Sequence, residues 1–320
     1  MTSPGLDDIG SMMTIRVVDP DGHTRDLVGT LLRPGAILRR DGTECAFDPA
    51  TVTHWRLIPL RVPRAGTGAP LSVRIRELEQ AMALTWPAEI TQEHDGWLLR
   101  AARGVTYRAN SALPIGPPPL GTPAKHLDEA IIRTIGFARE HGIVPMIQVP
   151  MPAYSTLDST LESCGWALAL EGVVMVADAP EVTTAASGSP APVILEDEPT
   201  LAWLSVQPDV TTEAIIRRCP ARYAVALAHG APVGTGRIAL ASGWGVISSV
   251  FITADARNSG LGRAVMRELA ASASGAGCSR LALQVNADNR RAIDRYERLG
   301  FRVHHRYRHR SFTELQEATS

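Results

Sequence analysis

The chain has 320 residues, of which 45% are hydrophobic and 20% charged, a composition typical of a soluble globular protein. Its formal net charge is −1, which argues against a general attraction to nucleic acid or to an anionic membrane. Aromatic residues make up only 5% of the chain, too few for an extended base-stacking surface. The length predicts two or three domains.

The four cysteines are scattered and form no Cys-x-x-Cys pair, so we predict neither a metal site nor a disulfide framework. No apolar segment is long enough to span a bilayer, and we expect no membrane partner. Residues 1–10 are acidic and lack the basic and apolar regions of a signal peptide. We therefore expect a cytoplasmic protein.

Short predicted strands separated by turns fill residues 11–62, after a disordered N-terminus at 1–10. Asp19-Pro-Asp-Gly22 and Asp41-Gly42 are the clearest turn signals. About fifty residues of this kind resemble a small SH3-like β-barrel. Either it is a structural cap, or its loops recruit a partner or border a substrate groove. The Pro- and Gly-rich residues 61–70 form a linker.

Two later regions show the same order of elements: strand, strand, loop, helix, strand, helix, strand. They cover residues 71–178 and 192–312, joined by a Ser/Thr-rich linker at 179–191 and followed by a tail at 313–320. We interpret them as two degenerate copies of one α/β fold in tandem.

The second copy contains a glycine-bearing loop between a strand and a helix. The strand Val250–Ile252 leads into Arg257-Asn-Ser-Gly260-Leu-Gly-Arg263, and apolar residues at helical spacing follow. The first amides of a helix lack internal partners and carry the positive end of its dipole. Such a loop is suited to a pyrophosphate.

A second motif follows at the spacing of a known family. After the apolar strand at 280–285 come Asn289, Ala292, Tyr296 and Gly300-Phe301. With the preceding loop, this resembles the GCN5-related N-acetyltransferase (GNAT) superfamily, in its tandem form. The resemblance implies an α/β (α+β) GNAT fold with a mixed central sheet, a degenerate GNAT-like domain at 71–178 and a catalytic GNAT domain at 192–312.

The resemblance also implies acetyl-CoA as co-substrate, in a ternary-complex mechanism with Tyr296 as general acid. The cofactor-binding residues it implies are Val250, Ile252, Arg257, Asn258, Ser259, Gly260, Leu261, Gly262, Arg263 and Asn289.

Simpler roles remain open for several of these residues. Tyr296 shares an apolar helix face with Ala292 and Leu299, so it is either the acid or part of the core. Asn289 either contacts the cofactor or has no ligand role, and Asn286 and Asp288 suit a helix cap.

The first copy has prolines where the second has its loop, at Gly116-Pro-Pro-Pro-Leu-Gly121. Proline has no amide donor. We therefore expect a structural or substrate-shaping role for this copy. Its segment Tyr107–Ser111 also resembles tandem GNAT proteins, and it either makes strand-end contacts or binds a ligand.

A general base is not identified, because residues 245–253 contain no carboxylate. A water relay through Ser248 or Ser249, or a carboxylate such as Glu196 or Glu213, are the alternatives. The basic strand at 301–310 either has a solvated face or lines the acceptor site.

We therefore predict an N-acetyltransferase whose acceptor is a protein lysine, an N-terminus or a small amine. The alternative from another class is an acyl-CoA-binding sensor or scaffold without turnover. The sequence predicts no oligomeric state.

Overall fold

The computed structural model describes residues 3–39, 42–58, 67–116, 127–188 and 191–313. The chain divides into two compact units, Met1–Val62 and Pro63–Ser320. Most of the proline-rich loop of the first copy, residues 117–121, and the tail beyond residue 313 lie outside the described residues. None of the described helices is both long and apolar enough to cross a membrane.

The N-terminal unit is an antiparallel sheet in the order β4-β3-β2-β1-β5. Alternate residues of β1, such as Met13 and Ile15, are buried against β2 and β3. The SH3-like barrel remains a prediction. The strands are β1 (Met12–Val18), β2 (Thr24–Arg33), β3 (Ala36–Leu38), β4 (Glu44–Ala46) and β5 (Val52–Leu57).

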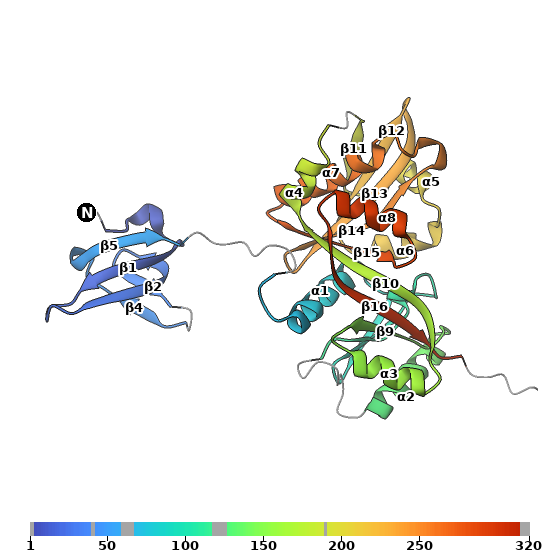
Figure 1. Ribbon diagram of the computed structural model, residues 1–320, viewed down its shortest axis with the longest axis horizontal. Helices are drawn as coiled ribbons and strands as arrows, with labels where there is room; N and C mark the ends of the chain where they lie inside the picture. Colours follow the sequence, from blue (N-terminus) through green and yellow to red (C-terminus); the bar gives the residue numbers. More distant parts are fainter. Residues whose placement is uncertain (1–2, 40–41, 59–66, 117–126, 189–190, 314–320) are drawn as a thin grey trace, which may run out of the picture. The chain divides into compact units, whose positions relative to one another are not determined.

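The larger unit contains the elements of both predicted copies (Figure 1). The first copy comprises α1 (Leu71–Thr85), β6 (Ile90–His94), β7 (Trp97–Ala101), the 3-10 helix η3 (Tyr107–Ala109), β8 (Leu113–Pro114), α2 (Leu127–Glu140), β9 (Met146–Met151), α3 (Ser155–Ser163) and β10 (Ala167–Asp178). The second begins with α4 (Ala179–Ala185), β11 (Val193–Glu196), α5 (Leu201–Val206), α6 (Glu213–Ile216), β12 (Ala221–Ala228) and β13 (Ala231–Ala241). It ends with β14 (Trp244–Ile252), α7 (Leu261–Gly275), β15 (Arg280–Asn286), α8 (Arg290–Arg298) and β16 (Arg302–Ser311).

One eight-stranded sheet joins the two copies, in the order β11-β12-β13-β14-β15-β10-β16-β9. The last strand of the first copy, β10, lies between the last two strands of the second and is antiparallel to both. In turn, β16 pairs with β9 of the first copy. Figure 1 shows β10 and β16 running side by side from one half into the other. The mixed sheet is confirmed, since β14 and β15 are parallel.

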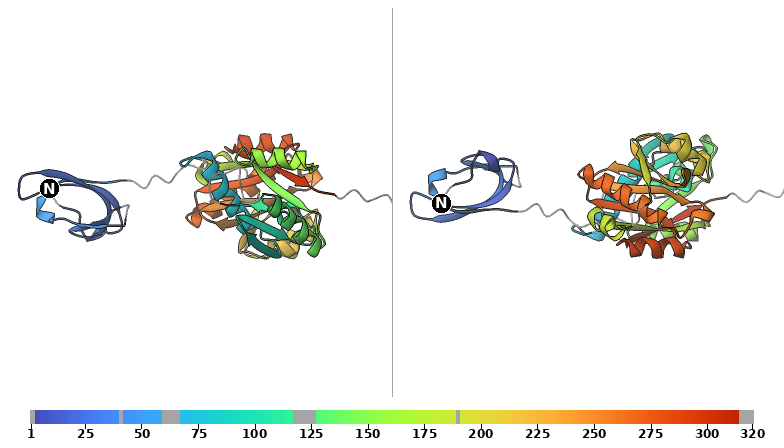
Figure 2. Two further views of the ribbon diagram at one scale, coloured as in Figure 1. Left: turned by 90° about the horizontal axis from the view of Figure 1, so that it is seen from below. Right: turned by 90° about the horizontal axis from the view of Figure 1, so that it is seen from above.

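Helices cover both faces of this sheet, as the further views show (Figure 2). On one face α7 contributes Val265 and Leu269 to the largest core, together with Met175 of β10. On the other face α1 packs Leu78 against Val174 of the same strand. Because β10 is buried on both faces, residues 173–177 are all apolar.

The predicted linker at 179–191 differs from what the structure contains. Its first part is helix α4, and Ala179, Val182 and Ala186 are buried in the core beside α7. These three small apolar residues recur at helical spacing among the Ser, Thr and Gly residues that suggested a linker. Composition alone therefore gave the wrong structure here.

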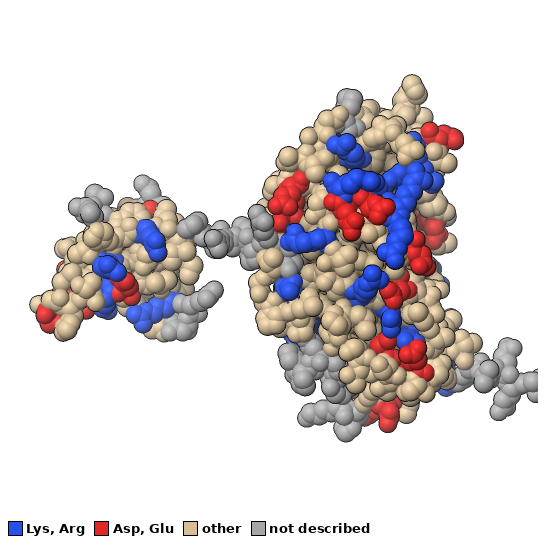
Figure 3. Space-filling model, in the orientation of Figure 1, with Lys and Arg blue, Asp and Glu red and all other residues tan. Residues whose placement is uncertain are grey.

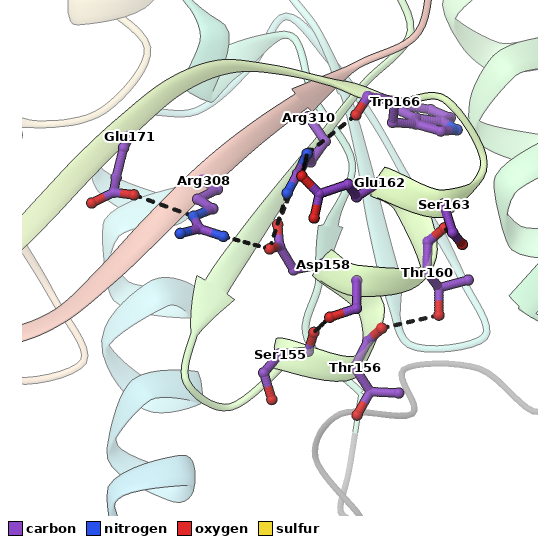
Figure 4. Close-up of polar contacts among 11 residues, drawn as sticks. Ser155, Thr156, Asp158, Thr160, Glu162, Ser163, Trp166, Glu171, Arg308 and Arg310 are labelled. Atoms are coloured by element: carbon purple, nitrogen blue, oxygen red, sulfur yellow. Dashed lines mark hydrogen bonds and ion pairs between the residues drawn. The ribbon is translucent and has the colours of Figure 1, made fainter.

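Two arginines of β16, Arg308 and Arg310, join the two halves, whereas Arg302 and Arg306 are exposed. Arg308 donates to Asp158 of α3 at 2.6 Å and to Glu171 of β10 at 3.2 Å. Arg310 donates to Asp158 through Nε and Nη2, at 2.8 and 3.1 Å (Figure 4). Arg310 is buried, so Asp158 supplies the countercharge that its burial requires.

We predict that Asp158→Asn lowers the free energy of unfolding by about 3 kcal/mol, because it leaves Arg310 buried without a countercharge. Burial acts to raise the pKa of the Asp158 carboxyl, but the hydrogen bonds and charges of Arg310 and Arg308 outweigh it and lower that pKa. The pair therefore stabilises the fold at neutral pH, and the stabilisation is lost as the pH falls through the folded-state pKa.

Urea unfolding of the variant measures this difference. Glu162→Gln is the matched control, since Glu162 is 69% exposed and lies 3.4 Å from Arg310. Equal stabilities of the two variants at pH 7 would contradict the assignment.

Candidate functional site

The site lies where two parallel strands part. The ladder between β14 and β15 ends at the pair Ile247–Leu283. Beyond it β14 stays paired only with β13, and β15 only with β10. The edge of β14 from Ser248 to Ile252 therefore has no strand partner on the β15 side, and its backbone groups other than the Ser249 and Ile252 carbonyls are available to a ligand.

A bulge in β14 shapes this edge. Ser249 has a left-handed backbone with φ of 54°, and the register to β13 shifts between Thr235 and Arg237. Gln207 fixes the bulge by donating to the Ser249 carbonyl at 3.1 Å. The bulge turns the following residues, Val250–Ile252, toward the opening.

The loop after β14 ends at the N-terminus of α7. Gly260 caps this helix with φ of 86°, a conformation that favours glycine. The Gly260 carbonyl accepts from the amides of Arg263 and Ala264. Within the described part of the chain, the amides of Leu261 and Gly262 have no hydrogen-bond acceptor. These amides form the positive end of the helix dipole, as predicted for an anion cradle.

A cavity of about 850 Å³ joins the β14 edge, this loop and α8. Nine of the predicted residues line it: Val250, Ile252, Arg257, Asn258, Gly260, Gly262, Arg263, Asn289 and Tyr296. Two predicted residues do not. Leu261 is buried in the core, and the Ser259 hydroxyl donates to the Ala256 carbonyl.

The cavity lining is strongly basic and contains no acidic residue. Five arginines line it: Arg257, Arg263, Arg291, Arg295 and Arg298. Basic side chains gather densely over α8 in the space-filling view (Figure 3). Asn258 joins the loop to this helix, since its Oδ1 accepts from Arg291 at 3.2 Å and from Arg295 at 3.1 Å. The cavity is therefore suited to a ligand with several negative charges.

Two of these arginines also have structural partners. Arg257 donates to the Ile252 carbonyl at 3.2 Å. Arg263 donates to the carbonyls of Ala185 and Ser187 at 3.0 Å each, which ties the start of α7 to the end of α4.

Tyr296 borders both the main core and the cavity, and its role as general acid stays a prediction. Its ring packs against Phe301 with centroids 5.8 Å apart and borders the main core. The side chain is only partly buried and also lines the cavity. Burial raises the pKa of the Tyr296 phenol to about 12, so the group keeps its proton across the neutral range.

Asn289 is the N-cap of α8, and its Oδ1 accepts from the Ala292 amide at 3.1 Å. Asn289 also lines the cavity. Asn286 performs a similar local task, accepting from the Asp288 amide at 2.9 Å.

The candidate bases differ in how close they lie to the cavity. The Ser248 hydroxyl lies at the parting point and is 3.4 Å from Arg237 Nη1. Glu196 is on β11, three strands away from β14. Glu213 is partly exposed and pairs with Arg217 at 2.8 Å. Neither glutamate lines the cavity.

Sequence reasoning missed Arg291, Arg295 and Arg298. The signal was present, because Arg291, Arg295 and Arg298 recur at intervals of four and three on the same helix as Tyr296. The three arginines thus share one face of α8, and a helical wheel would have grouped them.

Comparison with known proteins gives the same family for both halves. A family model described as "Probable histone acetyltransferase Rv0428c C-terminal" matches residues 72–310. The chain is 37% identical over 119 residues to the probable histone acetyltransferase Rv0428c of Mycobacterium tuberculosis, covering 35% of this chain and 36% of that protein. The alignment thus spans about a third of that relative's length.

A second relative covers more of the chain. The N-acetyltransferase YobR of Bacillus subtilis is 25% identical over 239 residues, covering 71% of this chain and 94% of that protein. Among solved structures, a GCN5-related N-acetyltransferase from Kribbella flavida matches with a TM-score of 0.60 and 16% identity, over 76% of this chain and 97% of that one. This likeness confirms the predicted GNAT fold.

We predict that Gly262→Glu weakens CoA binding at least tenfold, because its carboxylate would enter the cavity and repel the ligand's phosphates. The fold should persist. A Cβ at this position would meet only Ile252, at 3.8 Å, and a carboxylate in the first turn suits the helix dipole.

Titration calorimetry with CoA measures the effect. Gly275→Glu, the same charge change at the far end of α7, is the matched control. Unchanged affinity in Gly262→Glu would exclude the cavity as the cofactor site.

Proposed function

Since the chain belongs to the family of the probable histone acetyltransferase Rv0428c C-terminal part, we propose that it transfers an acetyl group from acetyl-CoA to a primary amine. The observation that carries this proposal is the cavity itself. It connects free amides at the start of α7 with the unpaired edge of β14 and with Tyr296, and its walls are basic.

Each part of acetyl-CoA would contact a different part of this cavity. The loop ending at Gly260 and the first turn of α7 would hold the pyrophosphate. Residues Val250–Ile252 would bond the pantetheine arm as an added strand would, and an amide of this edge would polarise the thioester carbonyl. The arginines of α8 would neutralise the remaining phosphate charge.

The reaction proceeds in a ternary complex. The neutral amine nitrogen attacks the thioester carbon, a C–N bond forms and the C–S bond breaks. The departing thiolate takes the proton of the Tyr296 phenol, and the amine loses one proton to solvent. The Tyr296 phenolate then regains a proton from solvent, which completes the turnover. A phenol is suited to this task because it stays protonated at neutral pH yet can donate to a developing thiolate.

The proposed acceptor is a primary amine of a protein lysine, a protein N-terminus or a small molecule. The name of the M. tuberculosis relative points to a protein acceptor, although the aligned stretch covers only about a third of it.

We predict that Tyr296→Phe lowers kcat for thiol release about 10²- to 10³-fold and leaves the CoA Kd within twofold, because only the proton donor is removed. Since the phenol pKa is raised to about 12, the wild-type rate should show no loss from Tyr296 deprotonation up to pH 10.

Thiol release with an amine library is the measurement, with Tyr154→Phe as control. Tyr154 is a buried tyrosine of the first copy, outside the cavity lining. Tight CoA binding without thiol release from any amine, and no effect of Tyr296→Phe, would favour the sensor instead.

A further inference from the structure

A second basic site lies on the face of the sheet that α1 covers. Three arginines from both halves, Arg100, Arg108 and Arg237, interact electrostatically there, and we call them the arginine cluster. Arg108 lies in η3 of the first copy, and its Nη1 donates to Gln284 of β15 at 2.8 Å. The two copies thus meet at this contact.

The arginine cluster adjoins the point where β14 and β15 part. Gln284, the partner of Arg108, is the first residue of β15 beyond the last parallel pair. Ser248, which contacts Arg237, is the first such residue of β14. The cluster therefore lies next to the opening in which Val250–Ile252 face the cofactor cavity.

Arg237 is anchored on all sides. It is 1% exposed, and its guanidinium donates to the carbonyls of Thr85 and Ile216 at 3.1 and 3.3 Å. Its Nε has no hydrogen-bond partner within the described ranges. Both Arg237 and Arg108 lie over the ring of Trp86, at 5.7 and 4.7 Å from its centroid. The indole thus orients two neighbouring cations.

Arg108 is the member that can receive a ligand. It is only half-buried, and no carboxylate of the described residues lies within ion-pair distance of it. Its Nε and Nη2 make no hydrogen bond to those residues, yet they are not sealed from solvent as the Arg237 Nε is. A planar pair of donors is therefore left available.

The charges of this region do not balance. Glu79 is the carboxylate that interacts with Arg100 and Arg108, and both of its oxygens are engaged. One accepts from Gln148 and the other bonds His305, each at 2.8 Å. Three guanidinium groups thus face one carboxylate among the described residues. An unbalanced buried charge is costly, and a bound anion would offset that cost.

A buried imidazole beside Arg108 also lacks partners. His309 is 1% exposed and packs between Tyr107 and Tyr307, with ring centroids at 5.6 and 5.5 Å. Neither of its nitrogens has a hydrogen-bond partner within the described ranges. Burial and the nearby Arg100 and Arg108 lower the pKa of His309 to about 3, so it is a neutral group able to donate one hydrogen bond.

We propose that Arg108 binds a carboxylate on the acceptor, so that the substrate is an amine that also carries a carboxylate group. The inference rests on the proposed acetyl transfer. A carboxylate matches the Nε–Nη2 edge of a guanidinium, since two parallel hydrogen bonds form. The same cluster disfavours a strongly basic peptide as acceptor.

The segment Tyr107–Ser111 then both positions its own loop and supplies Arg108. Asn110 fixes the loop, because its Oδ1 accepts from the amides of Ala102 and Gly104 at 2.7 and 2.9 Å. Ser111 accepts from Arg100 through its hydroxyl at 2.8 Å. These contacts hold η3 in place, so that Arg108 lies beside Gln284 and the ring of Trp86.

The test compares acceptors in matched pairs. Glycine, β-alanine, 4-aminobutyrate and L-lysine are each assayed beside their carboxamides, with acetyl-CoA and thiol release as the readout. We expect at least one acid to exceed its amide tenfold or more in kcat/KM. Arg108→Gln should reduce that preference about ten- to hundredfold, mainly through KM, and leave the amide rates and the CoA Kd unchanged.

Arg103→Gln is the control variant, because Arg103 lies in the same loop but is exposed and pairs with Glu89. Equal rates for every acid and its amide, or an acid preference that survives Arg108→Gln, would overturn the proposal. A preference for 2-aminoethylphosphonate over all the acids, or for a lysine-rich peptide, would overturn the assignment of a carboxylate.

A binding measurement separates this inference from the proposed function. The same acids are titrated calorimetrically into the CoA-bound protein. Binding that Arg108→Gln abolishes, without thiol release in the wild type, would support the carboxylate site and contradict acetyl transfer. No binding of any acid, together with no acid preference in the rates, would contradict the site.

Discussion

The rest of the structure depends on the insertion of β10 between β15 and β16. β10 pairs with the outer edge of β15 from Arg280 to Asn286, whereas β14 pairs with the other edge only as far as Leu283. β9 and β10 of the first copy therefore share one sheet with the strands of the second copy, while β6, β7 and β8 form a separate three-stranded sheet. The ion pairs of Asp158 with Arg308 and Arg310 stabilise the contact between the two copies, since they join α3 of the first copy to the last strand of the second.

The separation of β14 from β15 gives the sheet a different surface on each of its two faces. On the α7 side, backbone amides and the arginines of α8 surround a cavity without acidic residues. On the α1 side, side chains from both copies surround Arg108. The close approach of α7 makes the first surface possible: a Cβ on Gly236 would lie 2.6 Å from Val265. The helix can therefore sit directly over the sheet with its N-terminus at the opening.

The sequence predicted the second copy well because its signals are local. The glycine loop, the helix that follows and the Asn289–Phe301 segment specify their own structure within a few residues of each other. The partner of β10 was not predictable in this way. Residues 173–177 are apolar throughout, so their pattern indicates burial on both faces but does not name the neighbouring strands. Arg108 was missed as a neighbour of Gln284 for the same reason, since 176 residues separate them.

The pairing of β10 with β15 and β16 also explains how the first copy, whose loop is rich in proline, can contribute to the proposed carboxylate site. Its own loop offers few amides to a pyrophosphate. Yet β10 aligns Gly172 with Asn286 and Val174 with Gln284, which fixes the first copy against β15 residue by residue. Tyr307 of β16 lies directly over Gly172, where a Cβ would meet its ring at 2.1 Å. The Tyr307 ring is buried and interacts electrostatically with Arg108, and the position of Tyr307 follows from the backbone hydrogen bonds between β10 and β16. Because the shared sheet holds Arg108, the distance between Arg108 and the edge of β14 is fixed. Selection between similar amines requires such a fixed distance.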